Sequence, residues 1–381
     1  MRERYRHTAW LHLKKGHVGW LIRQAMKGLA IPLSQRLRHP LCGPVVAVVS
    51  PSFRCNLRCF MCGIRRPETA VEKGSADLAA WVDVLRQLKR LGVSGIAFGG
   101  GEPLLLPWIL DLCSAARDLS LPFHFNTNGL PMTEQVADEL LRIGPASVAV
   151  SLDSSDPATN DRLRGPGAFD GACRALTWLV AARRRTGAGS RLSLASVISR
   201  PSLPTLSETF DLAQKLGADT VSLVPVRPTF GFATPSGEAG NHKGERPGWT
   251  EEEARMAMAI LRTREAAGQT DISSELIDTL PDFFADRPFP GPCFAGYASL
   301  VIGPEGRVHP CLPFMEKGLS GGSVFDQGLV DIWRSPAYAT LRAQTTTCRA
   351  CFVPSHQELN LTLGRWSFGA GAGSSADPSH P

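Results

Sequence analysis

A regular alternation of apolar runs and amphipathic segments constrains the fold of this chain more than any other feature of its sequence. Six short apolar runs recur, at 45–51, 94–100, 122–127, 147–153, 191–199 and 219–226. The segments between them carry apolar residues at helical spacing, at 75–91, 106–118, 133–142, 169–185 and 204–216. Strands that alternate with helices predict a parallel sheet with right-handed crossovers. We therefore expect an α/β fold with a partial (β/α)6 TIM-like barrel, because six units suit an open barrel better than a closed eight-stranded one.

The sequence on either side of this barrel differs from it in composition. Two short runs, 298–302 and 307–311, flank a Gly-Pro-Glu-Gly turn and predict a β-hairpin. Residues 230–249 are rich in Gly and Pro and predict a mobile loop before a helix at 250–267. We expect five regions, namely a basic amphipathic helix region (1–43), the barrel core (44–268), a linker (269–292), a small hairpin-plus-helix extension (293–365) and a disordered tail (366–381).

Positive charge is concentrated at the start of the chain. The net charge is +6, and residues 1–40 contain nine Lys or Arg against one acid, Glu3. These residues contribute +8, so the remainder carries about −2 (6 minus 8). A nucleic-acid-binding protein usually spreads a basic face over its body, so no nucleic-acid partner is expected. No apolar run approaches the roughly 18 residues of a membrane-spanning helix, and no secretory signal is recognisable, so we expect a cytoplasmic protein.

The basic segment 8–38 has the pattern of an amphipathic helix. Six apolar residues share one face, namely Val18, Leu21, Ile22, Ala25, Met26 and Leu29. Pro32 and Pro40 are expected to interrupt or end the helix. The favoured interpretation is that the apolar face packs against the open barrel while the basic face stays in water. Contact with a membrane surface is the alternative.

Seven of the ten cysteines fall into two groups, and the first group predicts a metal cluster. Cys55, Cys59 and Cys62 lie in RCNLRCFMCG, directly after the first strand. Chemistry in parallel barrels gathers at this end of the strands. Three thiolates can take three corners of a [4Fe-4S] cubane and leave one iron open, whereas a zinc site, the alternative, normally takes four ligands. The remaining cysteines (Cys42, Cys113 and Cys173) are expected to be small buried apolar residues, because nothing indicates a disulfide framework.

The spacing Cys-x3-Cys-x2-Cys resembles the signature of the radical S-adenosylmethionine (SAM) superfamily. The residue before the last cysteine, usually aromatic in that family, is Met61 here. The resemblance implies that SAM is the remaining ligand of the open iron and is cleaved to a 5′-deoxyadenosyl radical.

Further motifs at the strand ends resemble SAM contacts of that family. FGGGEP, one strand–helix unit after the cysteines, matches the GGE motif that binds the methionine amino group. By this resemblance the cofactor-binding residues are Gly100, Gly101, Glu102, Asn126, Ser151, Asp153 and Arg164. Turn or helix-cap roles are the alternative for each polar residue, including the nearby Asn128.

The second group of cysteines lies in the extension. Cys293 and Cys311 flank Gly306, and Cys348 and Cys351 form a later Cys-x2-Cys pair. This pattern resembles the twitch or SPASM-type extensions of radical SAM enzymes, in their shorter form. The resemblance implies a second [4Fe-4S] cluster held by these four cysteines. A structural zinc site is the alternative, because four thiolates also suit zinc.

These features together predict an enzyme that abstracts hydrogen from its substrate, reduced by a flavodoxin- or ferredoxin-type donor. A small molecule is the favoured substrate, because the sequence before residue 44 contains no extra peptide-binding domain. Modification of a ribosomally made peptide is the first alternative, and a non-catalytic iron–sulfur electron carrier is the second. No acid or base is assigned, since Tyr297, Glu275 and Asp278 near the junction with the extension are explained equally well by packing or exposure.

Overall fold

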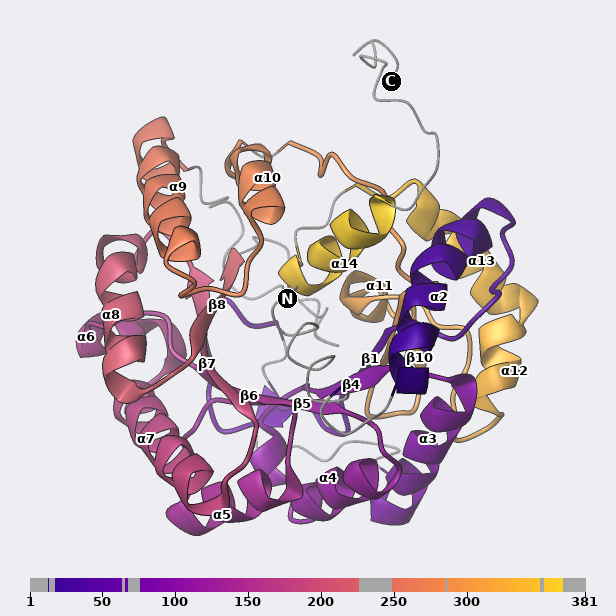
Figure 1. Ribbon diagram of the computed structural model, residues 1–381, viewed down its shortest axis with the longest axis horizontal. Coiled ribbons are helices and arrows are strands. Elements are labelled where there is room, and N and C mark those ends of the chain that lie inside the picture. Colours follow the sequence, from indigo (N-terminus) through magenta and orange to yellow (C-terminus); the bar gives the residue numbers. More distant parts are fainter. Residues whose placement is uncertain are drawn as a thin grey trace.

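A curved, mostly parallel sheet organises the molecule, and the helices that connect its core strands lie around the outside of the curve (Figure 1). The computed structural model describes residues 13, 18–63, 66–67, 76–225, 249–285, 287–349 and 353–365. The six core strands are β1 (Val46–Val49), β4 (Gly95–Phe98), β5 (Phe123–Thr127), β6 (Ser147–Ser151), β7 (Arg191–Ile198) and β8 (Thr220–Pro225). They lie side by side in that order and pair in parallel, which confirms the predicted partial barrel.

The helices between the strands match the periodicity of the sequence, with one addition. The helices that follow the core strands are α3 (Leu78–Leu91), α4 (Ile109–Asp118), α5 (Glu134–Ile143), α7 (Ala168–Thr186) and α8 (Leu206–Leu216). The added helix is α6 (Pro157–Arg164), which the hydrophobic pattern does not predict. Asp156 caps it by accepting a hydrogen bond from the Thr159 N–H at 2.9 Å, and a proline occupies its first turn.

The extension joins the barrel sheet. Its hairpin consists of β9 (Ser299–Ile302) and the antiparallel β10 (Val308–His309), as predicted. Beyond that prediction, β9 pairs in parallel with β1, with Val46 opposite Ser299, so that β1 has a neighbour along each edge. Short helices follow, namely α11 (Leu312–Glu316), α12 (Leu329–Arg334), α13 (Pro336–Thr346) and α14 (Pro354–Gly364).

The segment expected to be a linker contains α10 (Ser274–Phe284), which follows α9 (Glu251–Ala266). The glycine- and proline-rich loop lies outside the described residues except for its last position, and so does the tail 366–381. In the described part of the chain, no helix has the length and apolar character needed to cross a membrane.

The two faces of the sheet differ in their side chains. Phe98, Phe123 and Phe125 point toward the helices and are fully buried in the main hydrophobic core. The alternate residues face the concave side and are small or polar, such as the half-buried Ala97 and the exposed Asn126. Closed barrels fill this interior with bulky branched side chains. Among the described residues, this face therefore carries less bulk at these positions than the interior of a closed barrel.

The N-terminal helix α2 (Val18–Arg36) packs on the barrel with the face opposite to the one expected. Its buried residues are Lys27, Ile31, Pro32 and Ser34, and Ile31 contacts Tyr297 and the residues around it. The apolar face that the sequence suggested for packing is largely exposed, as at Val18, Ile22, Met26 and Leu29. Pro32 lies inside the helix and does not interrupt it. The expected packing was wrong because amphipathic spacing identifies a face but not what covers it.

A buried lysine fastens α2 to the barrel. Lys27 Nζ donates hydrogen bonds to the carbonyl oxygen of Pro44 at 2.8 Å, to Ser94 Oγ at 2.9 Å and to the carbonyl oxygen of Gly92. These acceptors lie just before β1 and β4, at the amino ends of the strands. Burial lowers the pKa of Lys27 to about 8.

We expect Lys27→Met to loosen α2, because the substitution leaves buried acceptors without a donor. A loss of about 2 kcal/mol corresponds to roughly 30-fold faster hydrogen exchange of the α2 amides. Lys89→Met is the matched control, since Lys89 bonds the Ser120 carbonyl from an exposed position at 3.2 Å. Unchanged exchange in the Lys27 variant would show that the lysine does not hold the helix.

Candidate active site

The candidate residues gather where the core strands end. Cys55 closes the short strand β2 (Arg54–Cys55), which pairs with β3 (Arg66–Pro67) just beyond β1. Cys59 and Cys62 follow on the same loop, where the Cys62 N–H donates to the Cys59 carbonyl at 3.1 Å. The loop is tied to α6, because the Phe60 N–H donates to the Leu163 carbonyl at 2.7 Å. The unpredicted helix therefore supports the cysteine loop.

The glycine turn after β4 lies directly against this loop. The Gly101 N–H donates to the Ser52 carbonyl at 2.9 Å, and the Glu102 N–H donates to the Arg54 carbonyl at 2.8 Å. A Cβ atom on Gly101 would lie 1.9 Å from the Arg54 carbonyl oxygen. Gly100 has a φ of +107°, a conformation that side chains disfavour. Both glycines are needed because two backbones approach each other here.

Glu102 is a buried carboxylate that joins the turn after β4 to the end of β5. Its Oε1 accepts from Thr127 Oγ1 at 2.8 Å and from the Leu104 N–H at 3.1 Å, and its Oε2 accepts from the Asn128 N–H at 2.6 Å. Burial raises the pKa of Glu102 to about 7, and these hydrogen bonds oppose the rise. A carboxylate has about four acceptor positions, so it retains capacity for an ammonium group.

Two asparagines lie at the carboxyl end of β5, Asn126 within the strand and Asn128 just after it. Asn128 Nδ2 donates to Asn56 Oδ1 at 2.7 Å and reaches Cys55 Sγ at 3.8 Å. Asn126 faces the open interior, and its Nδ2 donates to the Phe98 carbonyl at 3.0 Å. Asn128 is thus the closer of the two to the cysteine loop. The sequence motif FNTNG contains both asparagines, and only the structure shows that Asn128, not Asn126, contacts the cysteine loop.

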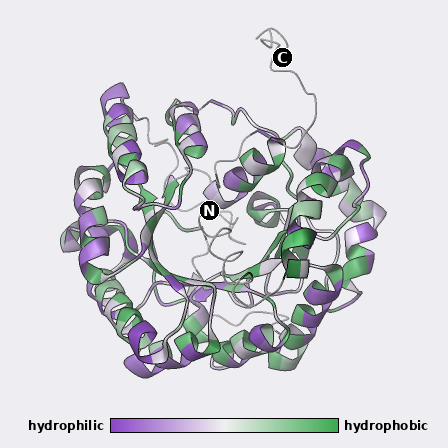
Figure 2. Cartoon of the chain, in the orientation of Figure 1, coloured by the Kyte–Doolittle hydropathy of each residue, from purple (hydrophilic) through white to green (hydrophobic). Residues whose placement is uncertain are grey.

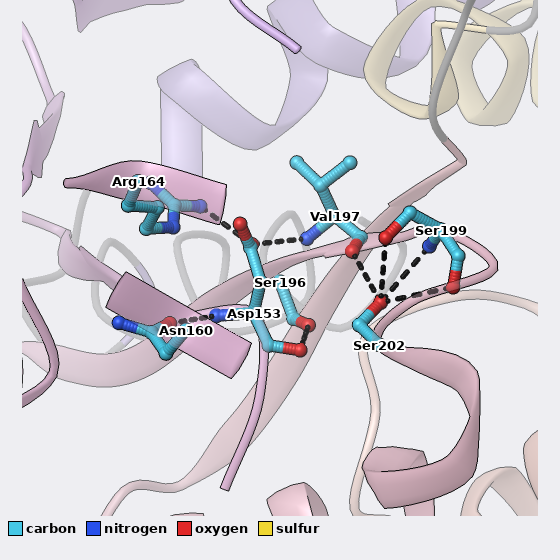
Figure 3. A network of polar contacts seen from close by, with 7 residues as sticks. All are labelled: Asp153, Asn160, Arg164, Ser196, Val197, Ser199 and Ser202. Atoms are coloured by element: carbon cyan, nitrogen blue, oxygen red, sulfur yellow. Dashed lines mark hydrogen bonds and ion pairs between the residues drawn. The ribbon is translucent and has the colours of Figure 1, made fainter. Parts of the chain in front are cut away.

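Asp153 and Arg164 form a buried ion pair beside the cysteines. The Asp153 carboxylate lies between the Arg164 guanidinium, at 2.6 Å, and the Val197 N–H, at 2.7 Å (Figure 3). Asn160 of α6 accepts from the Asp153 N–H at 2.9 Å, so this helix also fixes the loop after β6. Ser151, the last residue of β6, is half-buried and faces the interior.

Burial and a nearby cation act in opposite directions on the thiols of this loop. Burial raises the pKa of Cys59 to about 11, and the Arg164 cation opposes this rise most strongly. Cys55 and Cys62 lie close enough to raise the pKa of Cys59 further. Three mutually close thiols beside a buried guanidinium fit an anionic iron–sulfur cluster. Among the described side chains, no three His, Cys, Asp or Glu residues form a set for a single metal ion.

The cysteines of the extension lie on segments that contact one another. Cys293 precedes β9, Cys311 precedes α11 and Cys348 follows α13, whereas Cys351 lies outside the described residues. Cys311 is buried, and Cys293 and Cys348 are half-buried.

Hydrogen bonds join these segments. Thr345 Oγ1 of α13 donates to the Ala295 carbonyl at 2.8 Å, and the Phe289 N–H donates to the Arg349 carbonyl at 2.8 Å. Ser299 Oγ donates to the Pro310 carbonyl at 3.3 Å. The hairpin and the end of α13 therefore bring the neighbourhoods of the three described cysteines together.

Comparison with known proteins places both sets of cysteines in recognised domains. The family model of the radical SAM superfamily matches residues 49–190, and that of SPASM, an iron–sulfur cluster-binding domain, matches residues 293–352. The PqqA peptide cyclase of Streptomyces rochei is 30% identical over 318 residues, which cover 81% of each chain. The chain belongs to the radical SAM superfamily. It is a radical SAM enzyme with SAM and iron–sulfur cofactors, which removes the electron-carrier alternative.

Other relatives share this architecture. The mycofactocin maturase MftC of Mycobacterium tuberculosis is 26% identical over 334 residues, which cover 86% of this chain and 79% of MftC. The structure of Streptococcus suis SuiB bound to precursor peptide SuiA has a TM-score of 0.63 at 19% identity, covering 82% of this chain and 69% of SuiB. Native anSMEcpe with bound AdoMet has a TM-score of 0.61 at 14% identity, covering 85% of this chain and 97% of that one. These two structures support the fold.

Three residues considered near the junction with the extension have structural partners. Tyr297 is buried in a small apolar cluster, and the Arg342 guanidinium carbon lies 5.4 Å from its ring centroid. Glu275 pairs with Arg365, and Asp278 pairs with Arg262 at 2.7 Å. These contacts give none of them an acid or base role.

We expect Gly101→Ala to displace the cysteine loop, because its Cβ would overlap the Arg54 carbonyl. The anaerobically purified variant should lose about four irons per chain, one [4Fe-4S] cluster, and should form no 5′-deoxyadenosine from SAM. Gly99→Ala is the matched control, since its nearest atoms would lie 3.8 Å and 4.0 Å away. Full iron content in the Gly101 variant would mean that the close approach is not required.

We expect Arg164→Met to destabilise the protein by about 3 kcal/mol or more, because Asp153 would remain buried without its cation. Arg262→Met is the control, since the Arg262–Asp278 pair has a similar distance, 2.7 Å, but both side chains are 57% exposed. Its loss should cost about 1 kcal/mol or less. Chemical denaturation of the anaerobic proteins measures both values. Equal losses in the two variants would contradict the role of burial.

Proposed function

We propose that this enzyme matures a ribosomally made precursor peptide by abstracting a hydrogen atom from it. The observation that carries this proposal is the 30% identity, over four-fifths of both chains, to a protein named PqqA peptide cyclase. The similarity to MftC, named a maturase, supports it further. The sequence alone favours a small molecule, and the relatives favour the alternative that it left open.

In this proposal Cys55, Cys59 and Cys62 hold the cluster that binds SAM. Bound there, SAM and the cluster supply a 5′-deoxyadenosyl radical when an electron arrives from a flavodoxin- or ferredoxin-type donor. The backbone at Gly100 and Gly101 gives the cofactor close access, and Glu102 accepts from its ammonium group. This role fits the observed site because the loop, the turn and the carboxylate are already fixed together by hydrogen bonds.

The other polar residues divide into two sets. Asn126 is exposed and Ser151 half-buried on the concave face, and we assign both to contact with bound SAM. Asp153 and Arg164 bond to each other, so we assign them chiefly to holding α6 and the cysteine loop, with the guanidinium available to the SAM carboxylate through Nε, which has no partner among the described residues. All seven positions taken from the family resemblance therefore retain a role in the proposal.

The second cluster completes the electron balance. We assign it to Cys293, Cys311, Cys348 and Cys351. When a new bond forms within the peptide, the peptide loses two hydrogens. With both cofactors bound, one would pass as an atom to the radical that SAM supplies, and the other would leave as a proton to solvent and an electron that the second cluster would accept.

Exposed and small residues on the concave face of the sheet are consistent with access by a peptide. Asn126 on β5 and Val224 on β8 are exposed on this face, and Val224 remains 38% exposed. Small side chains such as Ala97, Ala149 and Ala195 line the strands between them. A peptide loop can therefore approach the strand ends that carry the cysteines.

The test is an anaerobic reaction of the reconstituted enzyme with SAM, a reductant and synthetic peptides encoded by short genes beside its own. We expect one peptide to stimulate 5′-deoxyadenosine formation and to lose about 2 Da when a crosslink forms. A peptide whose mass is unchanged in ordinary water but which gains one deuterium in heavy water would instead indicate epimerisation. Cys59→Ala is the control that should abolish both signals.

Stimulation by small carbinols or sugars, with no neighbouring peptide active, would overturn the peptide assignment and restore the small-molecule one. That outcome would leave the radical SAM class untouched. An absence of 5′-deoxyadenosine under all conditions would instead count against the assigned cluster site.

A further inference from the structure

An exposed apolar stripe runs along α2. The described part of the chain has twelve exposed large apolar side chains, and eight of them lie between residues 13 and 41. They are Leu13, Val18, Ile22, Met26, Leu29, Leu33, Leu37 and Leu41. At 100° per residue, the positions from Val18 to Leu37 fall within an arc of about 100°. We call this set the α2 stripe, and Figure 2 colours much of α2 as hydrophobic.

The barrel already occupies the opposite face of the helix. Lys27 and Ile31 lie roughly opposite the middle of the stripe and are buried. Gln35 Nε2 donates to the Cys293 carbonyl at 2.6 Å, which fixes the end of the helix to the extension. Rotation of α2 to cover the stripe would break these contacts. The stripe therefore needs a surface outside the described part of the molecule.

The charged residues beside the α2 stripe indicate which kind of partner surface it would bind. Arg23 and Arg36 are exposed and lie on opposite sides of the stripe on the helical wheel. The sequence contains no Asp or Glu between Glu3 and Glu68, and residues 1–40 carry a charge of +8. An apolar stripe flanked by arginines, on a segment whose own sequence holds no Asp or Glu, complements an anionic interface.

A second copy of the chain fits this pattern poorly. A two-fold dimer through the stripe would place the same arginines of both copies close together. A protein partner usually anchors its side chains in pockets, whereas the stripe follows the exposed face of a single helix. A flat, fluid surface of anionic phospholipid matches both the exposed face of the helix and the positive charge of the flanking arginines.

We propose that the α2 stripe docks this enzyme on an anionic phospholipid membrane surface, with α2 lying in the plane of the interface. The Lys27 contacts place α2 at the amino ends of β1 and β4, whereas Cys55 and Glu102 lie beyond their carboxyl ends. Docking through α2 thus leaves the end of the barrel that carries the chemistry turned away from the lipid. Membrane attachment and radical chemistry are separate properties of this chain.

Flotation of the full-length, reconstituted protein with vesicles tests this proposal. We expect it to float with phosphatidylcholine vesicles that contain phosphatidylglycerol, far less with phosphatidylcholine alone, and less as salt increases. Ile22→Gln/Met26→Gln should lower the bound fraction about tenfold or more, because two apolar side chains leave the interface. Arg23→Gln/Arg36→Gln should remove the preference for anionic lipid.

The control is Met256→Gln/Leu319→Gln, which replaces exposed apolar residues elsewhere on the surface and should float like the wild type. Every variant should form 5′-deoxyadenosine at the wild-type rate, because α2 lies away from the cysteine loop. Failure of the wild type to float, or equal flotation of the stripe variant, would overturn the proposal. A wild-type dimer that becomes a monomer in the stripe variant would assign the stripe to a second copy and overturn it as well.

Discussion

Strand β1 is the element on which both functional parts of the molecule depend, because it is paired along both of its edges. Val46 lies opposite Gly95 of β4 on one side and opposite Ser299 of β9 on the other. The loop with Cys55 therefore leaves the sheet between the turn that carries Glu102 and the hairpin that leads to the second set of cysteines. A slip in the register of this one strand would move both sets relative to the barrel, so its pairing fixes where the two sets of cysteines lie relative to each other.

Two buried carboxylates then fix the loops that β1 brings together. Glu102 collects hydrogen bonds from the residues that follow β4 and β5, and Asp153 joins the loop after β6 to α6 and β7. Burying a charge costs free energy, so such groups persist where orientation matters more than stability alone. Directional bonds of this kind hold loops in place where apolar contacts would let them slide.

The core strands and the spacing of the first cysteines can be predicted from local sequence, whereas helix α6 and the long-range contacts cannot. The six core strands and the spacing of Cys55, Cys59 and Cys62 are visible because periodicity and ligand spacing are local properties. Helix α6 escapes detection because it is short and mostly polar, leaving the Asp156 cap and the following proline as its signal. The pairing of β9 with β1 joins residues 253 positions apart (299 minus 46), and the packed face of α2 depends on Lys27 finding acceptors on the barrel. Both are long-range contacts that no window of sequence contains.

The small side chains on the concave face have a thermodynamic consequence. Where a closed barrel stabilises itself by filling its interior with bulky side chains, this one has only partly buried alanines at Ala97 and Ala195 and leaves Asn126 exposed. Whatever binds there replaces packing that the protein itself does not supply. Occupancy is then linked to folding, and a ligand at about 100 times its Kd adds about 2.7 kcal/mol to the free energy of unfolding. The free energy of unfolding of this enzyme therefore rises with the fraction of molecules that hold a ligand on this face.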